Sequence, residues 1–321
     1  MERSSGMITA DQLRVKNEKE SLTVAIIVTV IIFVVILGIS LFVFIIPLIF
    51  AVFYVKTTQG SYLGNAVKIT ERQFPDIYNT VYLAAERLSM PQPDVFIRQT
   101  PVIQAHAIGI WGRKSVVLTS ALVETMKPSE LACIIGHEFT HIKCEHTSWG
   151  ILANLHNSIP IPVISNLLSF IFLSWARKAE YTCDRGGLIV SQDVSASVAA
   201  IAKLAVGKQL FEKLDLDSFK GQKSEVSKDD ISRLSELLLT HPFFVNRIQK
   251  MNIYFNSASY RRLTSGVGKY DFDVFHDDLS SVQKEAKPES EVEDKVSYCT
   301  ECGNDLSKDD LICLNCGAIR E

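Results

Sequence analysis

The longest apolar segment of the chain lies close to its N-terminus. No charged residue occurs between Glu20 and Lys56, and this uncharged run far exceeds the ~20 apolar residues that a helix needs to cross a bilayer. It is also much longer than the roughly 7–15 apolar residues of a signal peptide. The pattern therefore predicts a transmembrane segment over residues 21–55, preceded by an N-terminal tail of residues 1–20.

Either one long tilted span or a hairpin of two spans fits this segment. A single straight helix would be about 50 Å long against a hydrocarbon core of ~30 Å, whereas a turn at residues 38–40 gives two slightly short arms. The positive-inside rule places basic flanks in the cytoplasm, and here both flanks are basic. We therefore favour the hairpin, with the N-terminus and the rest of the chain cytoplasmic. The flanking basic residues are Arg14, Lys16, Lys19, Lys56, Lys68 and Arg72.

After residue 56 the spacing of apolar residues predicts a mostly helical domain with a small β-sheet. Residues 73–87 are amphipathic at helical spacing, and residues 126–130 carry helix-start signals, with Pro128 early and Glu130 near the third position. Short β-like runs lie between these helices, and a continuous apolar run suits a buried strand. The runs are residues 95–97, 105–110 and 115–118.

Three later segments differ in composition from their surroundings. Residues 149–175 contain no Asp, Glu, Lys or Arg, but their apolar stretches are too short to span a bilayer, so a buried or membrane-apposed helix is favoured over insertion. Residues 210–235 are polar and predict exposed helix. Residues 261–297 are acidic and predict a flexible linker, which bounds a domain at residues 56–260.

Composition and charge narrow the classes of function. The 321 residues suffice for about two domains of ordinary size, and 47% of them are hydrophobic, which excludes global disorder. Lys plus Arg number 33 against 36 Asp plus Glu, a net charge of −3, so nucleic acid is not expected as a partner. Seven cysteines, an odd number, fit a reducing compartment better than a secreted disulfide framework.

The strongest chemical motif is His137-Glu138-Phe139-Thr140-His141. On a helix, histidines at i and i+4 lie one turn apart on the same face, so both imidazoles can bind one zinc ion. Glu138 lies beside them and is placed to take a proton from a zinc-bound water, whose pKa the metal lowers towards ~7. So short a motif also arises by chance, and it needs support from elsewhere in the chain.

Support comes from a second predicted helix that contains Glu180 and Asp184. A catalytic zinc takes three protein ligands and keeps one position open, and Glu180 is a suitable third ligand. Asp184 lies one turn further along the same face, where it can accept the second ring N–H of a ligand histidine and orient that ring. Two carboxylates at this spacing more often lie on a solvated helix face. Because they follow the histidine motif on the next predicted helix, we favour the metal site here.

In these motifs and their order along the chain, residues from about 71 to 247 resemble the HtpX-type membrane zinc metalloproteases. The CAAX prenyl proteases belong to the same family. The resemblance covers over half of the chain, and five features match in sequence order. These features are Thr100-Pro101, the run from Val116 to Leu122, Glu130-Leu131 before the histidine motif, Arg177-x-x-Glu180-x-x-x-Asp184, and His241-Pro242 with Arg247.

The resemblance implies a zinc endopeptidase fold with one catalytic Zn²⁺. It also implies that His241 stabilises the oxyanion and that Arg247 ties down the surrounding helix, although on the sequence alone His241 is equally a loop residue. The family roles are zinc ligand for His137, His141 and Glu180, general base for Glu138, and support of a ligand histidine for Asp184.

One departure from the family affects the expected substrate strand. Where the family usually carries Asn-Ala-Phe-Ala, this chain has Gln104-Ala105-His106-Ala107, a strand expected to pair with extended substrate. Gln104 can still hydrogen-bond a substrate backbone. His106 either approaches the zinc or the substrate or, as we favour, replaces an aromatic packing residue. His146, shortly after the zinc motif, is expected at the end of the helix rather than as a ligand.

Four of the seven cysteines form a compact motif at the C-terminus. Two C-x-x-C pairs, each followed by glycine, present four thiolates, which close a structural zinc site with no open position. A module of about 24 residues needs such a site for stability, and disulfides conflict with a cytoplasmic location. Residues 298–321 therefore predict a zinc ribbon whose acidic surface suits a protein partner. Its ligands are Cys299, Cys302, Cys313 and Cys316.

Together these features predict a membrane-anchored zincin (gluzincin) metallopeptidase domain with a C-terminal zinc ribbon, both facing the cytoplasm from the lipid bilayer. The resemblance implies that its substrates are membrane or misfolded proteins. The alternative is a catalytically idle scaffold that uses the fold and the ribbon for protein binding. The intact motif argues against this alternative, because an idle site has no need of the base Glu138.

Overall fold

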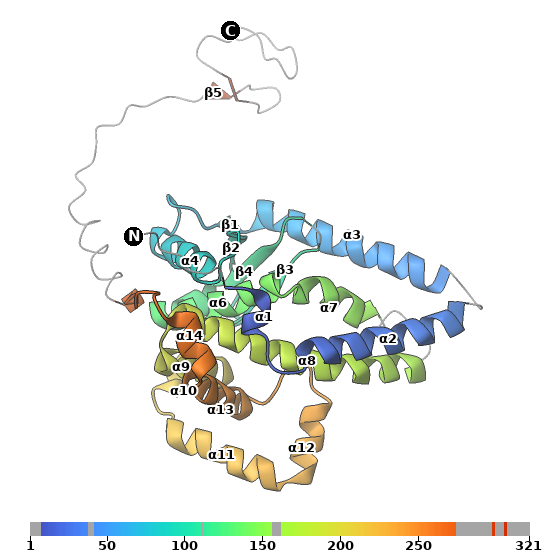
Figure 1. Ribbon diagram of the computed structural model, residues 1–321. Coiled ribbons are helices and arrows are strands. Elements are labelled where there is room, and N and C mark those ends of the chain that lie inside the picture. The colour runs from blue at the N-terminus through green and yellow to red at the C-terminus, as the bar shows by residue number, and fades with distance from the viewer. Residues whose placement is uncertain are drawn as a thin grey trace, which may run out of the picture. The chain divides into compact units, whose positions relative to one another are not determined.

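The computed structural model describes residues 8–37, 42–110, 112–155 and 162–273, together with residues 297–298 and 305–306. By its contacts the chain divides into two compact units, Met1–Asp277 and Asp278–Glu321. The described part of the first unit is mostly helical and contains one small sheet (Figure 1). The predicted fold class, mostly α with a small β-sheet, is therefore confirmed.

Four short strands form the sheet: β1 (Val67–Lys68), β2 (Asp94–Arg98), β3 (Ala105–Ile108) and β4 (Ser115–Thr119). Their order is β1-β2-β4-β3, in which β2 and β4 are parallel and the two outer pairs are antiparallel. All residues of β4 are buried, as its continuous apolar run predicts. Among the described strands β3 is at the edge of the sheet, so one of its two sides pairs with β4 and no described strand pairs with the other.

Two long helices, α6 (Pro128–Lys143) and α8 (Pro162–Ser191), pack against each other beside the sheet. α6 begins where the sequence predicts, with Pro128 in its first turn and the Glu130 carboxylate accepting a hydrogen bond from the backbone N–H of Lys127 at 2.8 Å. Nearly all of α6 is buried, because it also packs against α4 (Pro75–Arg87) and α9 (Val194–Val206).

The further helices of this domain are α5 (Ser120–Thr125), α7 (His146–Leu155), α10 (Lys208–Phe211), α11 (Leu216–Lys228), α12 (Asp230–Leu237), α13 (Phe244–Phe255) and α14 (Ala258–Thr264). α11 and α12 have no buried residue, as the polar composition of residues 210–235 predicts. The packing continues past the domain end expected at residue 260. Phe272 is buried, and Asp273 accepts hydrogen bonds from the backbone and the hydroxyl of Ser129, both at 3.0 Å.

The two apolar regions of the sequence, residues 21–55 and 149–175, are helical where the structure describes them. The first falls on α2 (Glu18–Leu37) and α3 (Phe42–Asn65), and α2 packs along α8 (Figure 1). The second falls on α7 and α8, with residues 156–161 outside the described part. Among the described residues, no helix combines the length and the apolar character needed to cross a membrane. The predicted turn at residues 38–40 lies outside the described residues.

The second unit is described at two short strands. β5 (Ser297–Tyr298) and β6 (Asp305–Leu306) pair antiparallel. The four cysteines of the predicted zinc ribbon, and most of the predicted linker, lie outside the described residues. The ribbon therefore stays a prediction.

Candidate active site

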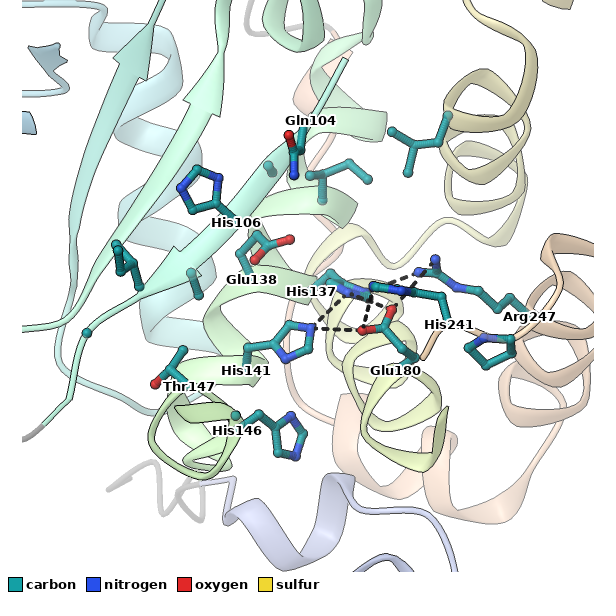
Figure 2. A pocket seen from close by; sticks show the side chains of 18 of the residues that line it. Gln104, His106, His137, Glu138, His141, His146, Thr147, Glu180, His241 and Arg247 are labelled. Atoms are coloured by element: carbon teal, nitrogen blue, oxygen red, sulfur yellow. Dashed lines mark hydrogen bonds and ion pairs between the residues drawn. The ribbon is translucent and has the colours of Figure 1, made fainter. Parts of the chain in front are cut away.

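Three side chains from two helices converge beside the sheet (Figure 2). His137 and His141 lie one turn apart on α6, and Glu180 faces them from α8. The Nε2 atoms of the histidines are 3.2 Å apart, and the carboxylate oxygens of Glu180 lie 3.6 Å and 3.5 Å from them. Ligands held tetrahedrally at ~2.1 Å from a zinc ion stand about 3.4 Å apart. The three groups therefore fit a zinc site.

Asp184 and Arg247 support the first histidine. The Asp184 carboxylate lies 3.2 Å from Nδ1 of His137, which leaves Nε2 of that ring directed towards the cluster. Arg247, from α13, donates to both carboxylate oxygens of Asp184 at 2.6 Å and 3.0 Å, and its guanidinium lies 3.7 Å from Glu180. The two residues thus fix the orientation that a ligand imidazole requires.

Nearby polar and charged groups lower the pKa of both Asp184 and Glu180, against the effect of burial. Burial alone would raise the pKa of Asp184, but the Arg247 guanidinium outweighs it and lowers that pKa. Burial would also raise the pKa of Glu180, but the hydrogen bond to His141 and the charge of His137 bring it well below its ordinary value. Both groups are therefore ionised near neutral pH, as metal binding requires.

Glu138 lies between the ligand cluster and β3, and its carboxylate points into a cleft (Figure 2). The cleft has a volume of about 950 Å³. One wall is formed by β3 and the residues before it, and the other walls come from α3, α7 and the segment before α13. Because β3 is an edge strand, an extended peptide can add to its open side within the cleft.

The predicted substrate strand lies along this cleft. Gln104 is tied to β4 through its backbone N–H and C=O, and Ala105 and Ala107 pack towards the main core. His106 instead contacts Tyr62 of α3, with Nε2 3.1 Å from the tyrosine hydroxyl. Burial lowers the pKa of His106, so the neutral ring packs here as an aromatic residue would.

His241 lies at the open side of the cluster and lines the cleft. Its side chain is 67% exposed, and Nε2 lies 3.5 Å from a carboxylate oxygen of Glu180. Its Nδ1 is 2.9 Å from the Thr240 hydroxyl. His241 therefore borders both the cleft and the cluster of His137, His141 and Glu180.

Two further groups, which no motif in the sequence connects with the site, also lie near it. The Cys183 sulfur and the ligand nitrogens of His137 and His141 lie within 4.8 Å of one another. Glu18, at the start of α2, is buried 3.1 Å from Nε2 of His146. No local sequence pattern links Glu18 with His146, because the two residues are 128 positions apart in the chain.

A helical domain that holds two histidines and a glutamate beside an edge strand has the features of a zinc-dependent metallopeptidase. Comparison with known sequences identifies the family. Residues 71–253, more than half of the chain, match peptidase family M48. The chain therefore belongs to this family, and the resemblance to HtpX-like metalloproteases is confirmed.

Three relatives illustrate the similarity. The chain is 32% identical over 216 residues to the plastoglobule-localized metallopeptidase 48, chloroplastic, of Arabidopsis thaliana, with 63% of each chain covered. It is 23% identical over 242 residues to a protease HtpX homolog of Streptococcus uberis, covering 63% of this chain and 81% of the relative. Protease HtpX homolog 2 of Methanosarcina mazei is 23% identical over 216 residues, covering 57% and 74%. The match thus spans slightly less than two thirds of the Arabidopsis protein.

Proposed function

We propose that this protein is a zinc-dependent endopeptidase. The observation that carries the proposal is the convergence of His137, His141 and Glu180 at mutual distances of 3.2, 3.5 and 3.6 Å, with Glu138 directed into the adjoining cleft. Membership of peptidase family M48 supports the same activity. The three converging residues are the ligands of the catalytic Zn²⁺.

A zinc ion held there would lower the pKa of a water molecule towards ~7 and polarise a peptide carbonyl. Glu138 is the general base that takes the proton of the attacking water and then delivers it to the leaving amine. Asp184 and Arg247 keep the His137 ring in one orientation. His241 stabilises the negative charge that develops on the carbonyl oxygen.

The substrate binds as an added strand on β3. Backbone groups of β3 that do not pair with β4 supply the hydrogen bonds of this pairing, which require an extended peptide. A folded substrate does not offer one, so unfolded segments of membrane or misfolded proteins are the substrate class. Ala51, Tyr54 and Val55, which belong to the predicted membrane segment, line the cleft, and this supports a substrate close to the membrane.

α2 and α3 attach the protein to the bilayer as a hairpin. Large apolar side chains are exposed on both helices, including Val35 at 72% and Phe50 at 66%, and apolar surface on this scale marks a contact with lipid or protein. Together with the basic flanks, this supports an integral membrane protein whose catalytic domain faces the cytoplasm. The C-terminal cysteines bind a second, structural Zn²⁺ and present a surface for a protein partner.

Cleavage of an unfolded protein such as casein, with and without a chelator, tests the proposal. We expect proteolysis that chelation abolishes and added zinc restores. Glu138→Gln should keep its zinc and lose at least about 10²-fold in activity, because the amide accepts no proton and Glu138 is not a ligand. Glu124→Gln, at an exposed position, is the control. A zinc-loaded protein that cleaves nothing would establish the idle scaffold instead.

A further inference from the structure

The helix α12 has its apolar residues on the face that points away from the domain. Its inward contacts come from Glu236, whose carboxylate accepts hydrogen bonds from the backbone N–H of Phe243 at 2.9 Å and from the side chain of Asn246 at 2.6 and 2.7 Å. The outward apolar residues are Ile231, Leu234, Leu237 and, just after the helix, Leu238, with exposed fractions of 77%, 59%, 52% and 49%. A surface helix of a soluble protein has the reverse arrangement, with its apolar face inward.

The neighbouring helix α11 has this ordinary arrangement. Its Leu216 and Phe219 pack against a buried cluster that includes Ile248 and Met251, and its polar residues face outward. The outward apolar face is therefore particular to α12, and a contiguous face of this kind marks a contact with an apolar partner.

The end of α12 is bound to α8 where that helix changes from uncharged to charged. Arg177 of α8 donates to the backbone carbonyl oxygens of Leu237 at 2.6 Å and of Leu239 at 3.0 Å. It is the first charged residue after the uncharged residues 149–175. α12 is thus attached to the domain at the boundary of this uncharged segment.

The N-terminal apolar segment begins at the same level. Lys178, next to Arg177, donates to the hydroxyl of Ser21, the first residue of the segment 21–55. Charged residues stay out of the hydrocarbon core of a bilayer, so on the proposed attachment of this segment the level of Lys178 and Ser21 is the bilayer surface. α12 runs across the direction of α2 and α8 (Figure 1), as a helix that lies in the plane of that surface does.

We propose that α12 is an interfacial helix whose outward face inserts into the surface of the bilayer that residues 21–55 enter. Such helices bury their apolar face by about 5–10 Å. The exposed charges beside the face cancel, since Lys228 and Arg233 balance Asp229 and Asp230, so burial of apolar surface and not attraction to anionic lipid holds the helix. Residues 21–55 must enter the bilayer for this contact to form, so it rests on the attachment proposed above.

Contact between α12 and lipid would also position the cleft. The chain continues from α12 into Leu239, His241 and Phe244, which line the cleft. One wall of the cleft would then lie at the bilayer surface, where an unfolded segment that leaves the bilayer can enter it directly.

Photocrosslinking in vesicles tests this proposal, because a benzophenone side chain bonds covalently to the C–H groups that lie against it. The full-length protein would be reconstituted into vesicles of phosphatidylcholine alone, with p-benzoylphenylalanine in place of Leu234 on α12. In a positive control the probe replaces Phe50 of α3, and in a negative control it replaces Ser224, an exposed residue of α11. Mass spectrometry identifies each adduct as lipid or as a second copy of the chain.

We expect lipid adducts at positions 234 and 50 and none at 224. Lipid adducts at 50 alone, or at 224 to the same extent as at 234, would overturn the interfacial helix and leave the membrane attachment in place. An adduct between two copies at 234 would overturn it too, by assigning the outward face to a dimer. Absence of lipid adducts at both 50 and 234 would overturn the membrane attachment and the interfacial helix together. If circular dichroism shows that the protein with the probe at 234 does not fold, Ile231, which is 77% exposed, is replaced instead, with the same expected adduct.

Discussion

Arg247 lies buried against two carboxylates of α8, those of Glu180 and Asp184, at the proposed metal site. Burial alone would lower the pKa of Arg247, but the neighbouring Asp184 raises it, so the guanidinium stays charged. It donates to both oxygens of Asp184, a forked contact that a lysine ammonium cannot reproduce. The shape of the cation, and not only its charge, therefore fixes Asp184 and the His137 ring.

We expect Arg247→Lys to weaken zinc binding at the catalytic site by about 10–100-fold, because loss of the fork frees Asp184 to rotate away from His137. Competition with a chelator of known affinity, on the full-length protein, measures this change. Arg262→Lys, at an exposed position, is the matched control and should leave zinc affinity unaltered. Equal affinities in the two variants would rule out the positioning role of Arg247.

The residues of the proposed metal cluster are predictable from the sequence because their spacing is local. His137 and His141, and likewise Glu180 and Asp184, are four positions apart, so any helix brings each pair to one face. Glu18 and His146 have no such relation. Their contact exists only because α2 and α7 meet in three dimensions. In the sequence, an acid at the start of an apolar helix is indistinguishable from an ordinary exposed residue of a first helical turn, even where it is buried.

At the level of elements, α6 and α8 approach closely because glycines line their contact. A Cβ added at Gly187 would come within 2.6 Å of the backbone carbonyl oxygen of Cys133, and one at Gly186 would overlap the Thr140 side chain. A backbone carbonyl cannot rotate away, so the helices would have to separate. The same contact sets the distance between the histidines of α6 and Glu180 of α8.

Gly187→Ala is therefore expected to lower the free energy of unfolding by ~1–3 kcal/mol, although alanine favours a helix over glycine by about 1 kcal/mol. Zinc affinity should fall as well, because the ligands on the two helices move apart. Denaturant unfolding and chelator competition measure the two effects.

Gly221→Ala on the exposed helix α11 is the control for this substitution. No atom lies within 4 Å of the added Cβ there, so only the helix propensity changes, and stability should rise by up to ~1 kcal/mol. If both alanines stabilised the protein alike, the close contact between α6 and α8 would not be what constrains Gly187.

The sequence predicts which segments are strands, but not how they are arranged. The apolar runs at residues 95–97 and 115–118 fall within β2 and β4, since burial on both faces leaves a local pattern. β3 lies at the edge because β2 pairs with β4 rather than with β3, although β3 comes between them in the sequence. The open side of β3, and with it the cleft, is a property of this order alone.

At the scale of the whole molecule, the N-terminal segment is part of the catalytic domain although it precedes the apolar segment. Leu13 is fully buried, the Val15 N–H donates to the Thr182 hydroxyl at 3.2 Å, and Arg185 donates to the carbonyl oxygen of Arg14 at 2.7 Å. These contacts place the chain before residue 21 on the same body as the chain after residue 55. If residues 21–55 enter a bilayer, both ends must then lie on one side, which a hairpin satisfies and a single span does not.

We therefore expect positions 5 and 265, on either side of the apolar segment, to be labelled from the same face of a membrane. Ser5→Cys and Ser265→Cys would be introduced one at a time into a chain whose four C-terminal cysteines are replaced by serine. The remaining cysteines, Cys133, Cys144 and Cys183, are buried, so they react little with a membrane-impermeant maleimide. Vesicles opened with detergent give the full extent of labelling at each position.

In sealed vesicles that keep the cytoplasmic face inside, neither cysteine should react, and in inverted vesicles both should. Contacts of the N-terminal segment with α8 keep both positions on one side, and the positive-inside rule assigns the basic flanks to the cytoplasm. Labelling of the two positions from opposite faces would contradict the hairpin and would require the N-terminal contacts to break in the membrane. Labelling of both positions from the outer face of the membrane would agree with a hairpin, but with the opposite orientation in the bilayer. A reducing compartment would then no longer account for the three unpaired thiols.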